Sequence, residues 1–247
     1  MDKLVYTAMT GAKNDLIRQD VLAHNLANVN TTGFRGQTVA FRSVPVQSAD
    51  TMDTRVMAVE STPGADFTVG PLQRTGNPTD VAINGAGWFA IQAQGGEAYT
   101  RNGSLVVAAD GTLQTQTGQA VLSDGGPISV PPASSIAIAT DGTITAVPMG
   151  STPKNAVSLG RLKLVNPPEA SLERGDDGLF RLKGGGTADA DPGVVVAPET
   201  LEGSNVNPVE ALVGMIALAR QFEAHMKMID NAQSNASKAS QLLAPGT

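Results

Sequence analysis

The sequence predicts an α+β protein with a long helix at each end of the chain and an all-β domain between them. Near both ends, apolar residues recur at steps of three and four, which is typical of helices that pack lengthwise against other helices. Between the ends, short apolar runs alternate with turn dipeptides such as Asn84-Gly85 and Asp141-Gly142, which favour hairpins. We therefore expect an N-terminal helix over 1–30, an extended arm over 31–79, a β domain over 80–200 and a C-terminal helix over 201–247.

The N-terminal helix should end close to Asn28, because Asn and Thr side chains compete with helical hydrogen bonds. Gly33 has free access to positive φ, so we predict that the chain turns there and that Phe34 is buried as it leaves the turn. The turn residues of interest are Asn25, Asn28, Thr31, Gly33 and Phe34. The apolar stripe of this helix, which Gln19 interrupts, contains Val5, Met9, Ala12, Leu16, Ala23 and Leu26.

The middle of the chain changes character twice. Four prolines, at 45, 63, 71 and 78, keep residues 31–79 from being helical, so this segment is predicted to be an extended, solvated arm. From Asp80 onward, frequent turns between short apolar runs favour an all-β domain that resembles a barrel or a sandwich.

The C-terminal helix has a clear start, because Asn207 can cap its free N–H groups and Pro208 suits its first position. It should be roughly 54 Å long at about 1.5 Å per residue, too long for a compact domain of this size to bury. Its stripe must therefore pack against the N-terminal helix, in a coiled-coil-like layer, and against other subunits. We predict an assembly interface formed by Val5, Met9, Ala12, Leu16, Leu26, Leu212, Met215, Ala219, Phe222, Met226, Ile229 and Leu243.

Composition excludes several functions. The formal net charge of −6 and the lack of a basic patch argue against nucleic-acid binding. The absence of cysteine excludes disulfides and thiolate metal sites. No apolar run is long enough to cross a membrane, and the N-terminus lacks the apolar core of a cleaved signal peptide, so we expect any export to leave the chain uncleaved.

No candidate for chemistry is convincing. Residues 85–90 fit a dinucleotide fingerprint, but they read as a turn followed by a strand, not by a helix. His24 and His225 are the only histidines, without evident further metal ligands. The acidic residues around Asp189 lack the glutamate that closes a calcium loop, and Asp176-Asp177 precedes a turn glycine. We expect no enzyme activity, no cofactor, no metal and no small-molecule substrate.

Several motifs resemble those of the bacterial flagellar rod and hook proteins. The stretch from Asn25 to Arg35 is similar to their N-terminal signature, and the stretch from Leu201 to Glu210 is similar to the signature that leads into their closing helix. The central motifs 80–89 and 99–104 match as well. Within this family, the chain length and the motifs 1–9, 160–165 and 174–181 look most like the proximal-rod members.

The resemblance implies a structural subunit that polymerises through its terminal helices into the axial drive shaft, which transmits torque. It implies as partners copies of this chain, other rod proteins, rod neighbours near the basal-body rings and the flagellar type III export apparatus. The expected location is the rod of the basal body, which spans the periplasm. The alternatives are a distal-rod or hook-type axial protein, a secreted adhesin with a helical stalk, and a glycan-cleaving enzyme on a β scaffold.

Overall fold

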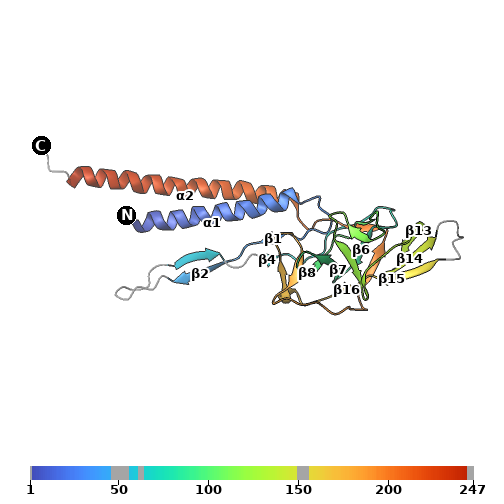
Figure 1. Ribbon diagram of the computed structural model, residues 1–247. Coiled ribbons are helices and arrows are strands. Elements are labelled where there is room, and N and C mark those ends of the chain that lie inside the picture. The colour runs from blue at the N-terminus through green and yellow to red at the C-terminus, as the bar shows by residue number, and fades with distance from the viewer. Residues whose placement is uncertain (1, 46–55, 61–63, 149–155, 244–247) are drawn as a thin grey trace. The chain divides into compact units, whose positions relative to one another are not determined.

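The computed structural model describes residues 2–45, 56–60, 64–148 and 156–243 (Figure 1). The chain divides into two units. The helical unit contains residues 1–27, 37–65 and 207–247, and the β unit contains residues 28–36 and 66–206. The predicted α+β class is confirmed, since a helix lies at each end of the chain and the region between them is largely β.

The helical unit is built on α1 (Asp2–Ala27) and α2 (Pro208–Leu243), which lie side by side (Figure 1). The helices are antiparallel, because Gly11 faces His225 while Leu22 faces Gly214. The predicted cap of α2 is confirmed, since Asn207 Oδ1 accepts hydrogen bonds from the backbone N–H of Val209 and of Glu210.

Two small antiparallel sheets complete the helical unit. One pairs β1 (Gln37–Thr38) with β4 (Gly64–Ala65), and the other pairs β2 (Phe41–Pro45) with β3 (Val56–Glu60). An isolated two-stranded hairpin is only marginally stable in water. The β2–β3 hairpin packs on α1, where the guanidinium of Arg18 lies 4.7 Å from the ring centroid of Phe41.

The main sheet of the β unit has nine antiparallel strands. Its principal order is β17-β18-β8-β7-β11-β10-β9, with β12 paired to β11 and β16 paired to β7. These strands are β7 (Trp88–Ala93), β8 (Gly96–Thr100), β9 (Leu105–Val107), β10 (Leu113–Thr115), β11 (Ala120–Ser123), β12 (Gly126–Pro127), β16 (Leu164–Val165), β17 (Leu172–Arg174) and β18 (Phe180–Leu182). A single 3₁₀ turn, Glu169–Ser171, precedes β17 within the described residues.

The β unit contains three smaller sheets besides the nine-stranded sheet. One has the order β13-β14-β15, and the others pair β19 with β6 and β20 with β5. Their bounds are β5 (Leu72–Arg74), β6 (Val81–Asn84), β13 (Ala133–Ile138), β14 (Thr143–Pro148), β15 (Val157–Arg161), β19 (Val195–Pro198) and β20 (Thr200–Glu202). Ile83, Phe89, Ile91, Leu113 and Ile144 belong to the buried apolar cluster that forms the core of the unit.

Most predicted turns join paired strands, but the turns at Asn84-Gly85 and Asn102-Gly103 do not. Asp141-Gly142 connects β13 to β14, which pair, and Gly95-Gly96 lies at the junction of β7 and β8. The expected hairpin at Asn84-Gly85 is wrong, because β6 pairs with β19 and β7 pairs with β8. Turn chemistry is local, whereas pairing depends on the strand partners that the whole sheet offers.

Tyr99 is fully buried in β8, where its hydroxyl donates to Glu97 Oε1 and accepts from the backbone N–H of Ala188. Burial raises the pKa of Tyr99 to about 12, and the adjacent Glu97 carboxylate acts in the same direction. Tyr99 therefore stabilises the fold fully below pH 10, its ordinary pKa, and this contribution is lost as the pH rises through about 12. We expect near-ultraviolet titration to show a late tyrosinate step that Tyr99→Phe removes. A late step that persists in Tyr99→Phe would contradict this assignment.

Candidate assembly interface

The face of α1 that packs on α2 is lined by small residues. Ala8 and Ala12 are buried on α1, and Ala211, Leu218 and Ala232 are buried on α2. Short side chains allow two helix backbones to approach closely, and Leu218 is the large side chain that is buried in this contact among the described residues.

At many positions the predicted interface stripe is offset by one residue from this packed face. On α2, for example, the stripe contains Leu212 and Ala219, whereas the packed face contains Ala211 and Leu218. Met9, Leu16, Leu212 and Met226 are between 41% and 54% exposed, and Ala219 is exposed as well. Ala12 is buried, whereas Val5, Leu26, Met215, Phe222 and Ile229 are half-buried along the edge of the α1–α2 contact. Leu243 lies in α2, but its side chain falls outside the described part of the chain.

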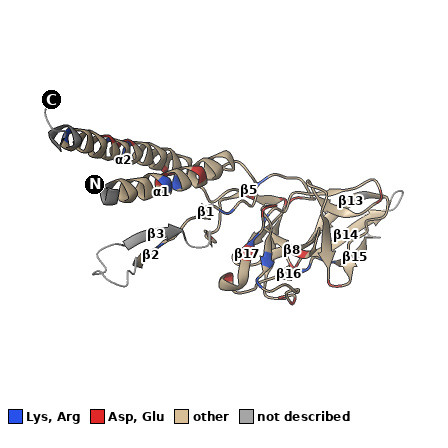
Figure 2. Ribbon diagram, turned by 60° about the vertical axis from the view of Figure 1, so that its left-hand side comes forward, with Lys and Arg blue, Asp and Glu red and all other residues tan. Residues whose placement is uncertain are grey.

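Further exposed apolar residues were missed by the sequence reasoning. Val209, Val213 and Ile216 on α2 are 67%, 61% and 55% exposed, and Tyr6 on α1 is 59% exposed. The sequence does contain a pattern that would have predicted them on α2, because Val209, Val213 and Ile216 form a second apolar stripe at steps of four and three. Between residues 209 and 228, α2 therefore presents apolar side chains outside its packed face, and Figure 2 shows few charged residues along this helix.

The N-terminal signature forms a turn at the end of α1. In the helical unit, the buried side-chain amide of Asn25 donates to Gln37 O and accepts from Gln37 N. In the β unit, Thr31 N donates to Asn28 O, and the Thr31 hydroxyl donates to Asn28 Oδ1. Asn28 therefore takes part in the turn that follows α1, through its backbone carbonyl and its side chain, whereas the side chain of Asn25 joins the last turns of α1 to β1.

Gly33 has φ +67° and Phe34 is buried, so both predictions for this turn are confirmed. A Cβ at Gly33 would lie 2.4 Å from both Arg101 C and Asn102 N, which is backbone that cannot move aside. Gly33 N also donates to Glu202 O at 2.7 Å. Glycine is thus required here both by the left-handed conformation and by the close approach of a second segment.

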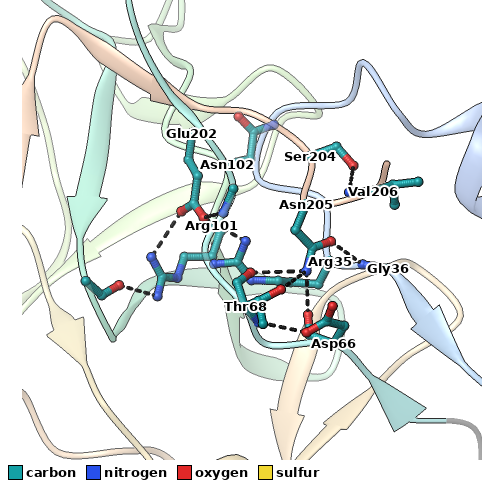
Figure 3. Close-up of polar contacts among 12 residues, drawn as sticks. Arg35, Gly36, Asp66, Thr68, Arg101, Asn102, Glu202, Ser204, Asn205 and Val206 are labelled. Atoms are coloured by element: carbon teal, nitrogen blue, oxygen red, sulfur yellow. Dashed lines mark hydrogen bonds and ion pairs between the residues drawn. The ribbon is translucent and has the colours of Figure 1, made fainter. Parts of the chain in front are cut away.

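Within the β unit, a buried ion cluster joins Glu202 of the C-terminal signature to Arg35 of the N-terminal signature and to Arg101 (Figure 3). Its Oε1 lies 2.7 Å from Arg35 Nη1 and accepts from Gly70 N, while its Oε2 accepts from Arg101 Nη1 at 3.0 Å. Arg35 and Arg101 are 1% and 3% exposed, which the expectation of a solvated arm did not foresee for Arg35. Burial lowers the pKa of Arg101 to about 10, although the Glu202 carboxylate opposes that shift.

Trp88 supports the two cations of this cluster. The guanidinium carbons of Arg35 and Arg101 lie 5.9 Å and 5.4 Å from its ring centroid. Arg174 acts on the outer side, donating to Arg35 O while its guanidinium lies 4.7 Å from the Phe34 ring centroid. Aromatic faces thus compensate part of the charge that a single carboxylate cannot balance.

The side-chain amide of Asn205 fastens three segments of the β unit together (Figure 3). Its Oδ1 accepts from Gly36 N at 2.7 Å, and its Nδ2 donates to Asp66 O and to Thr68 O. Asp66 N in turn donates to Gly36 O. The chain passes between the two units after residues 27, 36, 65 and 206. Asn205 lies next to the last of these boundaries, and its side chain bonds to Gly36 and Asp66, which lie at two others.

Substituting Asn205 tests this role. Asn205→Ala is expected to lower the free energy of unfolding of the β unit by about 1–2 kcal/mol, because the buried Gly36 N–H and the half-buried Asp66 carbonyl lose their partner. Asn205→Asp keeps the acceptor for Gly36 N but loses the donor to Asp66 and Thr68. The protection of the Gly36 amide in this variant should therefore lie between that of the parent protein and that of Asn205→Ala. Hydrogen exchange at Gly36 measures this order directly, and equal protection in all three proteins would contradict it.

Comparison with known proteins gives matches along most of the chain. Residues 5–35 match the family described as flagella basal body rod protein, and residues 82–146 match the flagellar hook protein FlgE/F/G D1 domain. Residues 197–242 match the flagellar basal body rod FlgEFG protein C-terminal family. The flagellar basal-body rod protein FlgF of Salmonella typhimurium is 47% identical over 98% of this chain and 99% of its own length. The chain belongs to the flagellar basal-body rod protein family.

Other relatives of this rod protein are consistent with that assignment. FlgF of Caulobacter vibrioides is 36% identical over 94% of both chains. The rod protein FlgG of Buchnera aphidicola from Acyrthosiphon pisum is 31% identical over 96% of this chain and 98% of its own length. Across the parts of this rod protein that the structure describes, no helix is long and apolar enough to cross a membrane, and no group of His, Asp and Glu side chains could hold a metal ion.

Proposed function

We propose that this chain is a structural subunit of the flagellar basal-body rod and that it assembles through the outer faces of α1 and α2. The observation that carries this proposal is the exposed apolar surface of the two helices, which includes Met9, Leu16, Leu212, Val213 and Ile216. Burying a side chain of this size contributes about 1.5–3 kcal/mol. A row of them would stabilise an assembly well, after the cost of ordering is subtracted.

The proximal rod is the position that the relatives favour. The FlgF proteins of Salmonella typhimurium, Escherichia coli and Caulobacter vibrioides are 47%, 47% and 36% identical to this chain. In Buchnera aphidicola, FlgF and FlgG are about equally similar to it, at 31% and at 30–31%. A distal-rod or hook-type role is therefore less well supported. An adhesin would not need exposed apolar stripes on both terminal helices.

Partners and location follow from the family. We propose that the chain contacts copies of itself and other rod proteins near the basal-body rings, and that the flagellar type III apparatus exports it into the periplasm without cleavage. We retain the division into 1–30, 31–79, 80–200 and 201–247 as a proposal for the assembled subunit. Electron microscopy of isolated basal bodies carrying a labelled copy of this chain tests the location, and label elsewhere than on the rod would contradict it.

Phe222→Asp tests assembly through α2. Phe222 is half-buried beside the α1–α2 contact, and a carboxylate buried there without a partner would cost several kcal/mol or be forced to take up a proton. We expect loss of rod incorporation and of swimming, at a normal level of subunit and with a folded β unit. Gln221→Asp, at an exposed neighbouring position of α2, adds the same charge and is the matched control. Normal swimming with Phe222→Asp would rule out this edge of α2 as an assembly surface.

A further inference from the structure

The packed faces of α1 and α2 carry few features that would fix how far one helix slides along the other. Buried alanines recur on both, at 8 and 12 on α1 and at 211 and 232 on α2. Alanine has no projecting side chain that a slide of one helical turn would displace, so these buried alanines do not fix the register. A pair of this kind needs a specific determinant of register.

Each helix contains one glycine, and each glycine receives a large side chain from the other helix. A Cβ at Gly11 would lie 2.5 Å from Cε1 and 2.7 Å from Nε2 of His225. A Cβ at Gly214 would lie 2.9 Å from Cδ1 of Leu22. We call Gly11 and Gly214 the glycine notches. The imidazole and the leucine side chain occupy space that any other residue would fill with its own Cβ.

The two notches are spaced alike. In α1 the notch at 11 and the inserted Leu22 are eleven residues apart, and in α2 the notch at 214 and the inserted His225 are also eleven residues apart. Eleven residues are close to three full helical turns, so each helix presents its notch and its inserted side chain on one face. Because neither helix has a second glycine, only one antiparallel register fills both notches.

A charged contact lies at the same point as the first notch. Asp15 Oδ2 is 3.5 Å from His225 Nε2, and the Asp15 side chain is 4% exposed. Within the described residues, Asp15 Oδ2 and His225 Nδ1 have no hydrogen-bond partner. Sliding His225 away would leave the Asp15 carboxylate buried against apolar side chains, which is costly.

We propose that the two glycine notches, together with the Asp15–His225 contact, set the register of the α1–α2 pair. Register decides which apolar side chains of the two helices lie at the same level on the outer surface. Gly11, Leu22, Gly214 and His225 are thus positioning residues for whatever surface the pair presents. The inference deepens the proposed assembly function, but it concerns one chain by itself and can be tested without any partner.

The chain lacks cysteine, so engineered cysteine pairs report register cleanly. Gln19→Cys with Leu218→Cys reports the observed register, because these positions lie one turn along each helix from the Leu22–Gly214 contact. Gln19→Cys with Met215→Cys and Gln19→Cys with Phe222→Cys report slides in the two directions. Oxidation of the purified full-length chain, followed by non-reducing electrophoresis, gives the ratio of observed to shifted cross-links.

Gly214→Leu should improve the intrinsic helix propensity of α2. A leucine side chain fills the notch, so Leu22 cannot make room by turning only the methyl group that lies 2.9 Å from the Cβ position. We therefore expect Gly214→Leu to lower the ratio of observed to shifted cross-links by at least about tenfold, which corresponds to roughly 1.4 kcal/mol. Adding Leu22→Ala to Gly214→Leu removes the clash and should restore much of that ratio. An unchanged ratio in Gly214→Leu would overturn the proposal, as would a double variant that cross-links no better than the single one.

The charged contact has a parallel test. Asp15→Leu with His225→Leu replaces the polar pair by apolar residues, so shifted cross-links should appear although the seam is more apolar. Leu218 is buried in the same seam, and Leu218→Ala with a Leu26→Cys and Ala211→Cys reporter should lower only the yield of the observed cross-link. If the shifted pairs, Gln19→Cys with Met215→Cys and Gln19→Cys with Phe222→Cys, cross-linked equally well in Leu218→Ala and in the leucine double variant, general weakening and not the Asp15–His225 contact would control register.

Discussion

Glu202→Gln is expected to lower the free energy of unfolding of the β unit by about 3–5 kcal/mol, because it leaves two buried cations without their carboxylate. Both side chains that face Glu202, those of Arg35 and Arg101, are almost fully buried, and neither can reach water without disrupting the unit. Glutamine keeps the volume and one acceptor for Gly70 N, so the loss measures charge and not packing. Chemical denaturation followed by the fluorescence of Trp88, the only tryptophan, reports the cluster directly.

Glu199→Gln is the matched control for that result. Glu199 also binds an arginine, with Arg74 Nη2 2.8 Å from its carboxylate, but both side chains are substantially exposed. Exposed ion pairs contribute only about 0–1 kcal/mol, so this variant should unfold close to the parent protein. If the two glutamine variants lost the same small amount of stability, the Glu202 cluster would not be the structural centre of the two signatures.

Gly33→Ala is expected to be the second most damaging single change. An alanine in the left-handed conformation costs roughly 1–2 kcal/mol. Its Cβ would also lie 2.4 Å from backbone atoms of Arg101 and Asn102, and forcing a group into such a packed site costs about 1–3 kcal/mol more. We expect reduced stability of the β unit and non-motile cells. Thermal unfolding and a swimming assay measure the two effects.

Gly76→Ala separates the two causes. Gly76 has φ +74°, close to that of Gly33, but a Cβ there would meet nothing within 4 Å. The free energy of unfolding of Gly76→Ala should therefore fall only by the cost of the left-handed conformation, about 1–2 kcal/mol. Equal losses in the two alanine variants would mean that the contact of Gly33 with Arg101 and Asn102 contributes nothing.

Local chemistry in the sequence determined much of this protein. The cap at Asn207, the turn at Gly33 with its positive φ, and the hairpin at Asp141-Gly142 each depend on residues close together in the chain, and the structure contains all three. The two apolar stripes predicted the terminal helices, and the signature motifs predicted the family. These features can be predicted from the sequence because the residues that determine each of them are close together in the chain.

Only the tertiary structure decided which stripe of α2 faces α1. The predicted stripe follows Leu212, Ala219 and Met226, whereas the packed face follows Ala211, Leu218 and His225. Both have heptad spacing, so periodicity alone cannot choose between them. The choice falls on the stripe that fits the small residues and the notch of α1, and it places His225 where an apolar side chain was expected.

The buried polar contacts could not be predicted either. Glu202 meets Arg101 from 101 residues away, and Asn205 meets Gly36 from 169 residues away. Arg35 and Glu202 each look like ordinary surface residues in the sequence, since charged side chains are rarely buried without a partner. Their burial is possible only because folding brings the partner to them, and no local pattern records which distant residue that will be.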